Sequence, residues 1–143
     1  MTILSIEMLT PERVTELWPV LEPYFSAACE SNEIAKDEMS VKDIYLLAVT
    51  GLVAIFVGFE NNKPACAIGI QFNMTNGRKC ADVIAMAGRG LLRFKAAYWH
   101  IILEWLKSNE VRYLDAYVPE RHTKLYLHRF GFNKSCAYVR MAL

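Results

Sequence analysis

The stretch Cys80-Ala81-Asp82-Val83-Ile84-Ala85-Met86-Ala87-Gly88-Arg89-Gly90-Leu91-Leu92 joins two different hydrophobic periods. Its first part, 80–86, is mostly small, β-branched or apolar, which is typical of a strand. After the glycines, apolar residues recur at spacings of three and four as far as Leu106 and form one broad stripe. The stretch therefore predicts a strand, a tight turn and then the longest helix of the chain, which ends near residues 108–109.

Two further strands are predicted before this one. Residues 52–59 form a continuous β-branched and aromatic run, and residues 65–72 form a second run of the same kind. The segment between them, 60–64, has turn composition, and Asn76-Gly77 is a typical two-residue hairpin turn. A three-strand meander should therefore lead into the long helix.

The N-terminal part should contain a strand followed by helices. Residues 3–8 are predicted as a short strand, with Thr10 as the N-cap of a helix and Pro11 at its first position. The apolar stripe of that helix is interrupted by Pro19 and Pro23. Because a proline inside a helix removes a hydrogen bond and clashes with the preceding turn, the pattern predicts two short helical pieces.

A second helical segment follows. Ser40-Val41-Lys42-Asp43 has the form of a capping box, and the apolar run after it extends to Gly51. Beyond the long helix, residues 112–118 are predicted as a strand, residues 121–130 as a short helix and residues 135–143 as a last strand. The predicted order is β-α-α-β-β-β-α-β-α-β, an α/β (α+β) fold in one domain that spans residues 1–143.

Composition and charge exclude several functional classes. The chain has 16 basic and 15 acidic side chains, a net charge of +1, so no overall field should attract nucleic acid or an anionic membrane. No stretch approaches the roughly 18 uninterrupted apolar residues of a membrane span, and the N-terminus lacks the pattern of a secretion signal. We therefore expect a cytoplasmic protein that binds neither nucleic acid nor membranes.

The cysteines and histidines do not form a metal-binding pattern. The cysteines at positions 29, 66, 80 and 136 are far apart, and with the three histidines they form neither a CxxC pair nor a cluster with metal-ligand spacing. We expect no metal site and interpret the cysteines as reduced core residues.

The element order, with a three-strand meander before the long helix, resembles the GNAT superfamily of acyl-CoA-dependent N-acyltransferases over essentially the whole chain. The junction from Ala85 to Gly90 is similar to the superfamily's pyrophosphate loop, usually Gln or Arg, any two residues, Gly, any residue, and Gly or Ala. Gly88 and Gly90 occupy the two small positions, whereas Ala85 stands at the Gln or Arg position. The resemblance implies acetyl-CoA as the cofactor.

The loop has the properties that a phosphate site needs. Glycines let the backbone approach phosphates, and the N–H groups at the start of the following helix lie at the positive end of its dipole. The resemblance places the strand backbone against the pantetheine and the loop around the pyrophosphate; the residues implied are Val83, Ile84, Ala85, Gly88, Arg89 and Gly90. A tight turn without a ligand, with Arg89 as a solvated side chain, remains the alternative.

A second motif, Leu127-His128-Arg129-Phe130-Gly131-Phe132, looks like the superfamily's Leu-Tyr followed by three residues and Gly-Phe. In catalytic members that tyrosine protonates the departing coenzyme thiolate. Counting back from Gly131 places Leu127 at the tyrosine position, and the neighbouring Tyr126 points about 100° away around the helix. Tyr126 is therefore the candidate catalytic residue only if the helix is rotated or shifted in register.

Two functions remain open. One is an N-acetyltransferase that passes an acetyl group from acetyl-CoA to an unknown amine acceptor. Its general base would come from a set of carboxylates chosen by residue type alone, namely Glu30, Glu33, Asp37, Glu38 and Asp82.

The other is a catalytically degenerate protein that acts by binding a phage or host protein, for example in virion assembly. The chain looks closest to small GNAT-like proteins of tailed bacteriophages, which implies host cytoplasm or virion as its location. This resemblance rests on Leu17-Trp18-Pro19, Thr50-Gly51, residues 87–91 and Phe130-Gly131-Phe132. A homodimer is compatible with either function.

Overall fold

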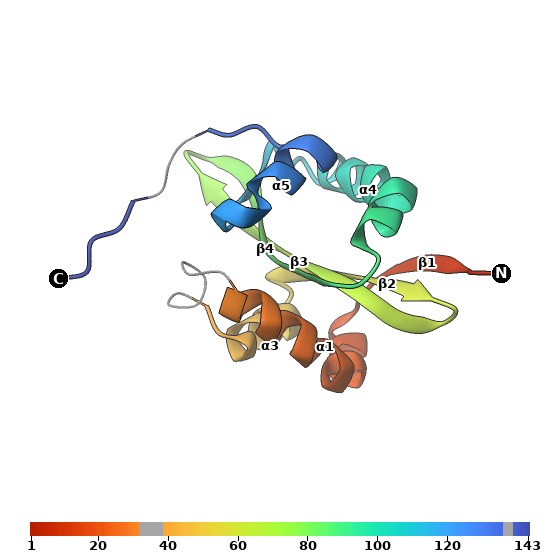
Figure 1. Ribbon diagram of the computed structural model, residues 1–143. Helices are drawn as coiled ribbons and strands as arrows, with labels where there is room; N and C mark the ends of the chain where they lie inside the picture. Colours follow the sequence, from red (N-terminus) through yellow and green to blue (C-terminus); the bar gives the residue numbers. More distant parts are fainter. Residues whose placement is uncertain (32–38, 136–138) are drawn as a thin grey trace.

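The computed structural model describes residues 1–31, 39–135 and 139–143, and it places one sheet between two layers of helices (Figure 1). The sheet contains five strands, β1 (Leu4–Met8), β2 (Val53–Glu60), β3 (Lys63–Thr75), β4 (Arg78–Gly88) and β5 (Tyr113–Ala116). The helices are α1 (Pro11–Ser31), α3 (Val41–Val49), α4 (Leu91–Ser108) and α5 (Thr123–Arg129), with a short 3-10 turn, η1 (Glu120–His122), before α5. Helices α1 and α3 cover one face of the sheet, and α4 and α5 cover the other (Figure 1).

The strands follow one another across the sheet in the order β1-β2-β3-β4-β5. The first four pair antiparallel, and β4 pairs with β5 in parallel because α4 carries the chain back over the sheet. The two hairpin turns have positive φ at both central residues, in Asn61-Asn62 and in Asn76-Gly77. The mixed sheet with flanking helices confirms the predicted α+β class and the predicted meander.

Each face of the sheet has its own apolar core, because successive side chains of a strand point to opposite faces. On the α1 face, Leu21 and Phe25 pack with Ile55 and Val57 of β2. On the α4 face, Ile102 and neighbouring residues of α4 pack on β2, β3 and β4. The two cores hold the sheet between its helical layers.

The prediction of two helical pieces at the N-terminus is wrong, because α1 is one continuous helix with Pro19 and Pro23 inside it. Both prolines are exposed, so the carbonyl groups left without a donor face solvent. The opposite face of the helix buries Val14, Leu21 and Phe25 against the sheet and α3. This packing outweighs the roughly 3 kcal/mol by which each internal proline disfavours a helix.

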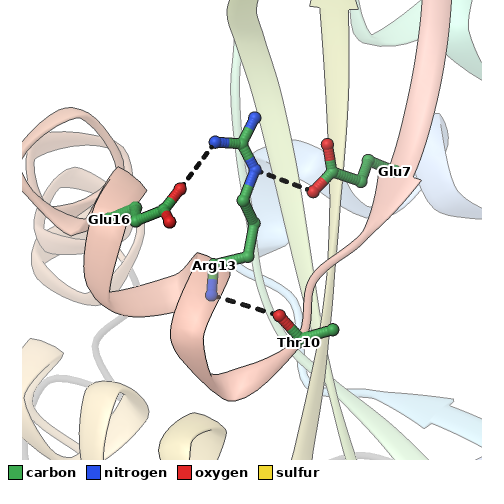
Figure 2. A network of polar contacts seen from close by, with 4 residues as sticks. All are labelled: Glu7, Thr10, Arg13 and Glu16. Carbon is green, nitrogen blue, oxygen red and sulfur yellow. Dashed lines mark hydrogen bonds and ion pairs between the residues drawn. The ribbon is translucent and has the colours of Figure 1, made fainter.

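Both predicted helix caps are confirmed. The Thr10 Oγ1 atom accepts a hydrogen bond of 3.2 Å from the Arg13 N–H, and Arg13 also contacts Glu7 and Glu16 at 2.9 Å each (Figure 2). This network ties the end of β1 to the first turn of α1. At α3, the Ser40 Oγ atom accepts from the Asp43 N–H at 3.2 Å while the Asp43 carboxylate accepts from the Ser40 N–H at 2.9 Å, which completes a capping box.

The prediction of a last strand at residues 135–143 is wrong for the residues that the structure describes. Residues 135 and 139–143 have no strand pairing, and Val139 and Met141 are 88% and 82% exposed. The reason is that an alternating pattern forms a strand only where a sheet edge and an apolar surface receive it, and the described residues of this segment pack on neither. Residues 136–138, including Cys136, lie outside the described residues.

Cys29, Cys66 and Cys80 are free and buried, as the sequence indicated. Among the described residues, no helix combines the length and the apolar character that crossing a membrane requires.

The packing of α4 on the sheet can be tested with two adjacent residues. Ile102 is 4% exposed and Ile101 is 46% exposed. We expect Ile102→Ala to lower the free energy of unfolding by about 2–5 kcal/mol, because it leaves a cavity under the helix. Ile101→Ala should change it by no more than about 0.5 kcal/mol. Urea unfolding of both variants measures the difference, and equal effects would contradict this packing.

Candidate functional site

The candidate site begins where β4 loses one of its two neighbours. β4 pairs with β3 from Arg78 to Gly88, but its pairing with β5 covers only 80–83, ending at Val83 opposite Ala116. Residues 84–88 therefore have a strand partner on the β3 side alone. Among the residues that the structure describes, no strand pairs with their other backbone edge, which can therefore form hydrogen bonds with a ligand.

A β-bulge lies at this point of divergence. Gly69 of β3 is opposite Ala85, and the next residue, Ile70, is opposite Val83, so Ile84 is the extra residue of β4. A bulge bends its strand and increases the local twist. β4 therefore changes direction where β5 ends, and the predicted residues Val83, Ile84 and Ala85 lie together at this opening.

Gly88 and Arg89 are tied to β3 through their backbone. A Cβ atom on Gly88, which has a φ of +113°, would lie 2.5 Å from the Cys66 Cα atom and would also collide with the Ala65 carbonyl oxygen. The N–H of Arg89 donates to that same carbonyl at 2.9 Å. Close strand packing thus accounts for the glycine at position 88, and the Arg89 N–H is already used within the fold.

The first turn of α4 has N–H groups that the helix itself does not use. Gly90 is the N-cap residue, with a φ of +71°, and no side-chain hydrogen bond caps the helix. Its carbonyl accepts from the N–H groups of Arg93 and Phe94 at 3.0 and 3.2 Å. The N–H groups before Arg93 have no intrahelical acceptor, so they remain available at the positive end of the helix dipole.

Two arginines flank this turn. The Arg93 Nη2 atom lies 2.7 Å from the Glu60 Oε2 atom, and the Arg89 Nη1 atom lies 3.6 Å from the same oxygen. The sequence reasoning named Arg89 and missed Arg93. A basic residue in the first turn of a helix, where the dipole disfavours it, was the available signal.

Tyr126 belongs to an aromatic cluster. Its ring centroid lies 5.8 Å from that of Phe130 and 5.5 Å from that of Phe132, and its carbonyl accepts from the Phe132 N–H at 3.1 Å. Burial raises the pKa of the Tyr126 hydroxyl to about 12, because the phenolate would lose its hydration.

Among the five candidate general bases, Asp82 is half-buried and has a raised pKa. Asp82 is half-buried on β4, directly opposite Asp115 of β5, and it accepts a hydrogen bond from the Asn73 amide. Burial and then the charge of Asp115 raise its pKa, whereas the bond from Asn73 acts in the opposite direction. Glu30 is exposed in the last turn of α1. Glu33, Asp37 and Glu38 lie outside the described residues.

A small apolar cavity of about 40 Å³ lies between α4 and the sheet. Its wall includes Met86, Phe94, Lys95 and the Cys66 side chain, and burial raises the pKa of the Cys66 thiol to about 11. The thiol is therefore protonated at neutral pH and unsuited to act as a nucleophile. The residues that the structure describes contain no group of three or more potential metal ligands.

No protein-family model matches the chain, and no curated protein matches it. A predicted acetyltransferase of Clostridium acetobutylicum, solved with acetyl-CoA, has a TM-score of 0.68 at 10% identity and covers 98% of this chain and 96% of its own. A GCN5-related N-acetyltransferase from Ralstonia eutropha has a TM-score of 0.69 at 12% identity, covering 98% and 99%.

An aminoglycoside acetyltransferase from an uncultured soil metagenomic sample also has a TM-score of 0.69, at 13% identity and with 99% of both chains covered. The chain therefore has a GNAT-like fold, as the resemblance predicted. At this identity the likeness concerns the fold alone.

The burial of Tyr126 predicts a pH dependence of stability. Its pKa is raised from 10.0 to about 12 in the folded state, so the unfolded chain loses this proton first as the pH rises. The free energy of unfolding should therefore decrease as the pH rises from the lower of these pKa values to the higher one. At lower pH this group should not affect the free energy of unfolding. Tyr126→Phe should remove this part of the decline.

The matched control is Tyr113→Phe, which alters an exposed tyrosine of β5. Chemical unfolding at pH 9 to 12 measures all three proteins. A Tyr126→Phe variant whose decline equals that of the wild type would show that Tyr126 is not buried in this way.

Proposed function

We propose that the protein binds acetyl-CoA at the open edge of β4 and the first turn of α4 and acts as an N-acetyltransferase on an amine. The observation that carries the proposal is the continuity of three features, namely the edge of residues 84–88 that faces away from β3, the uncapped start of α4 and the guanidinium groups of Arg89 and Arg93. The fold likeness to a structure solved with acetyl-CoA supports it.

The residues present suit the two chemically distinct parts of this cofactor. The amide groups of a pantetheine arm can pair with the free backbone edge of β4, as an added strand would. The free N–H groups of Leu91 and Leu92 can donate to a pyrophosphate. Ala85 stands at the Gln or Arg position of the loop motif and cannot supply a positive charge. Arg93 supplies one beside the loop, and Arg89 supplies a second.

For transfer, the bound cofactor supplies an activated thioester, and the protein must orient an amine and move protons. With that thioester in place, attack by the amine nitrogen on its carbonyl carbon would break the carbon–sulfur bond, and the amine proton and the released thiolate would each need a partner. We assign the acceptance of the amine proton to Asp82, whose raised pKa makes its carboxylate a stronger base than an exposed aspartate. Asp82 lies on β4, one residue before the last one paired with β5.

Protonation of the thiolate requires a proton donor near the sulfur. Leu127 has no proton to give, and the Tyr126 side chain is packed against Phe130 and Phe132. The Tyr126 hydroxyl carries a proton at neutral pH, as any tyrosine does, but burial raises its pKa and makes it a weaker acid. Without it, water would protonate the thiolate, with a loss of about 10²–10⁴ in rate.

The second function is a GNAT-like protein that acts by binding another protein. Two observations favour it, the leucine at position 127 and the alanine at position 85. The resemblance to phage-encoded proteins and a virion or host partner belong to this hypothesis and remain predictions. A homodimer, which is compatible with either function, also remains a prediction. It requires a stable protein complex and no acetyl transfer.

Calorimetric titration with acetyl-CoA tests the first function. We expect micromolar binding by the wild type and at least about tenfold weaker binding by Arg89→Glu, because the reversed charge lies beside the pyrophosphate. Lys107→Glu makes the same charge change on an exposed residue at the other end of α4 and should leave binding unchanged. A glycine variant at position 88 is unsuitable, because any side chain there collides with β3.

If the wild type gives no heat of binding at millimolar acetyl-CoA, the proposed acetyltransferase function is excluded. Equal weakening by Arg89→Glu and Lys107→Glu would place the binding site elsewhere. Tight, specific binding would justify a screen of amine acceptors.

A further inference from the structure

We propose that Glu60 is an internal counter-ion of the cofactor site. In the free protein its carboxylate pairs with the guanidinium groups of Arg89 and Arg93 and thereby weakens the binding of phosphate groups. The inference rests on the proposed function, since it concerns the same first turn of α4. It assigns a role to a residue of β2 that is remote in sequence from both the loop and the motif at the C-terminus.

The fold holds the Glu60 carboxylate beneath the start of α4. Glu60 is the last residue of β2, opposite Leu4 of β1 and Lys63 of β3, and it precedes the tight Asn61-Asn62 turn. It follows Phe56 and Gly58 on the face of the sheet that packs against α4. Its side chain is only 19% exposed, whereas those of Arg93 and Arg89 are 50% and 63% exposed.

One oxygen of this carboxylate faces both guanidinium groups. The Glu60 Oε2 atom lies 2.7 Å from Arg93 Nη2 and 3.6 Å from Arg89 Nη1. The same Arg93 Nη2 atom would lie 2.9 Å from a Cβ atom on Gly90, so the Arg93 head rests on the N-cap residue of α4. The carboxylate is therefore separated from the predicted phosphate position by a single guanidinium group.

This arrangement makes Glu60 a competitor of an incoming phosphate. A phosphate that forms charge-assisted hydrogen bonds with Arg93 must share the guanidinium with Glu60 or displace it, and the two anions repel each other. The arginine heads are half-exposed, so this exchange requires no unfolding of the core. Neutralising Glu60 should therefore tighten phosphate binding by about three- to tenfold at low salt, and by less at high salt.

The opposite sign is expected if Glu60 only positions Arg93. In that case its loss would free the guanidinium to move, and phosphate binding would weaken. The direction of the change in affinity thus distinguishes a competing anion from a positioning residue.

The experiment compares wild type, Glu60→Gln and Glu104→Gln by calorimetric titration with acetyl-CoA and, separately, with inorganic pyrophosphate at 20–300 mM salt. Glu104→Gln removes one carboxylate of an exposed ion pair with Lys107 near the other end of α4, so it controls for net charge. We expect Glu60→Gln alone to bind each probe more tightly, with the gain shrinking as salt rises. Circular dichroism checks that all three proteins are folded.

The outcomes separate the two proposals. If the wild type binds acetyl-CoA and Glu60→Gln binds it equally or more weakly, the counter-ion role is overturned and the proposed function stands. If pyrophosphate binds more tightly to Glu60→Gln while acetyl-CoA binds to neither protein, the counter-ion role stands and the proposed function fails. If neither probe binds to any of the folded proteins at millimolar concentration, both are overturned.

Discussion

The structure depends on how β4 is held between its two neighbours. Along β3 it is paired over its full length, and near the end of this pairing Gly88 packs so closely that no side chain fits. Along β5 it is paired only as far as Val83, and the bulge at Ile84 turns it away from that point. The same pairing positions the start of α4, so the open edge and the helix start form one continuous surface.

Short sequence patterns were sufficient to predict much of the fold. The Asn76-Gly77 turn and the Ser40 capping box depend on the conformations and hydrogen bonds of neighbouring residues, so their sequence patterns identified them. The glycines of the β4–α4 junction were found for the same reason. Features that depend on distant parts of the chain were not found: the continuous α1 is stabilised by the core against which it packs, and the last strand lacked a sheet edge.

In the candidate site, too, residues within a local motif could be predicted, whereas contacts between distant parts of the chain could not. Arg89 could be predicted because it lies within the glycine motif, whereas the pairing of Arg93 with Glu60 joins residues 33 positions apart. Asp82 could not be separated from other carboxylates by sequence, because its raised pKa depends on burial and on Asp115 of the neighbouring strand. The groups proposed to bind the cofactor lie on one continuous surface, whereas Leu127 has no proton to donate. A protein that acts by binding is therefore the second candidate beside an acetyltransferase.

Backbone amide chemical shifts during an acetyl-CoA titration test the central claim most directly, because they locate the ligand residue by residue. Our account predicts saturable shifts at residues 84–88 and at Gly90, Leu91 and Leu92, with the amides of α3 on the opposite face unchanged. Shifts confined to the α1 and α3 face, or none at millimolar acetyl-CoA, would contradict it.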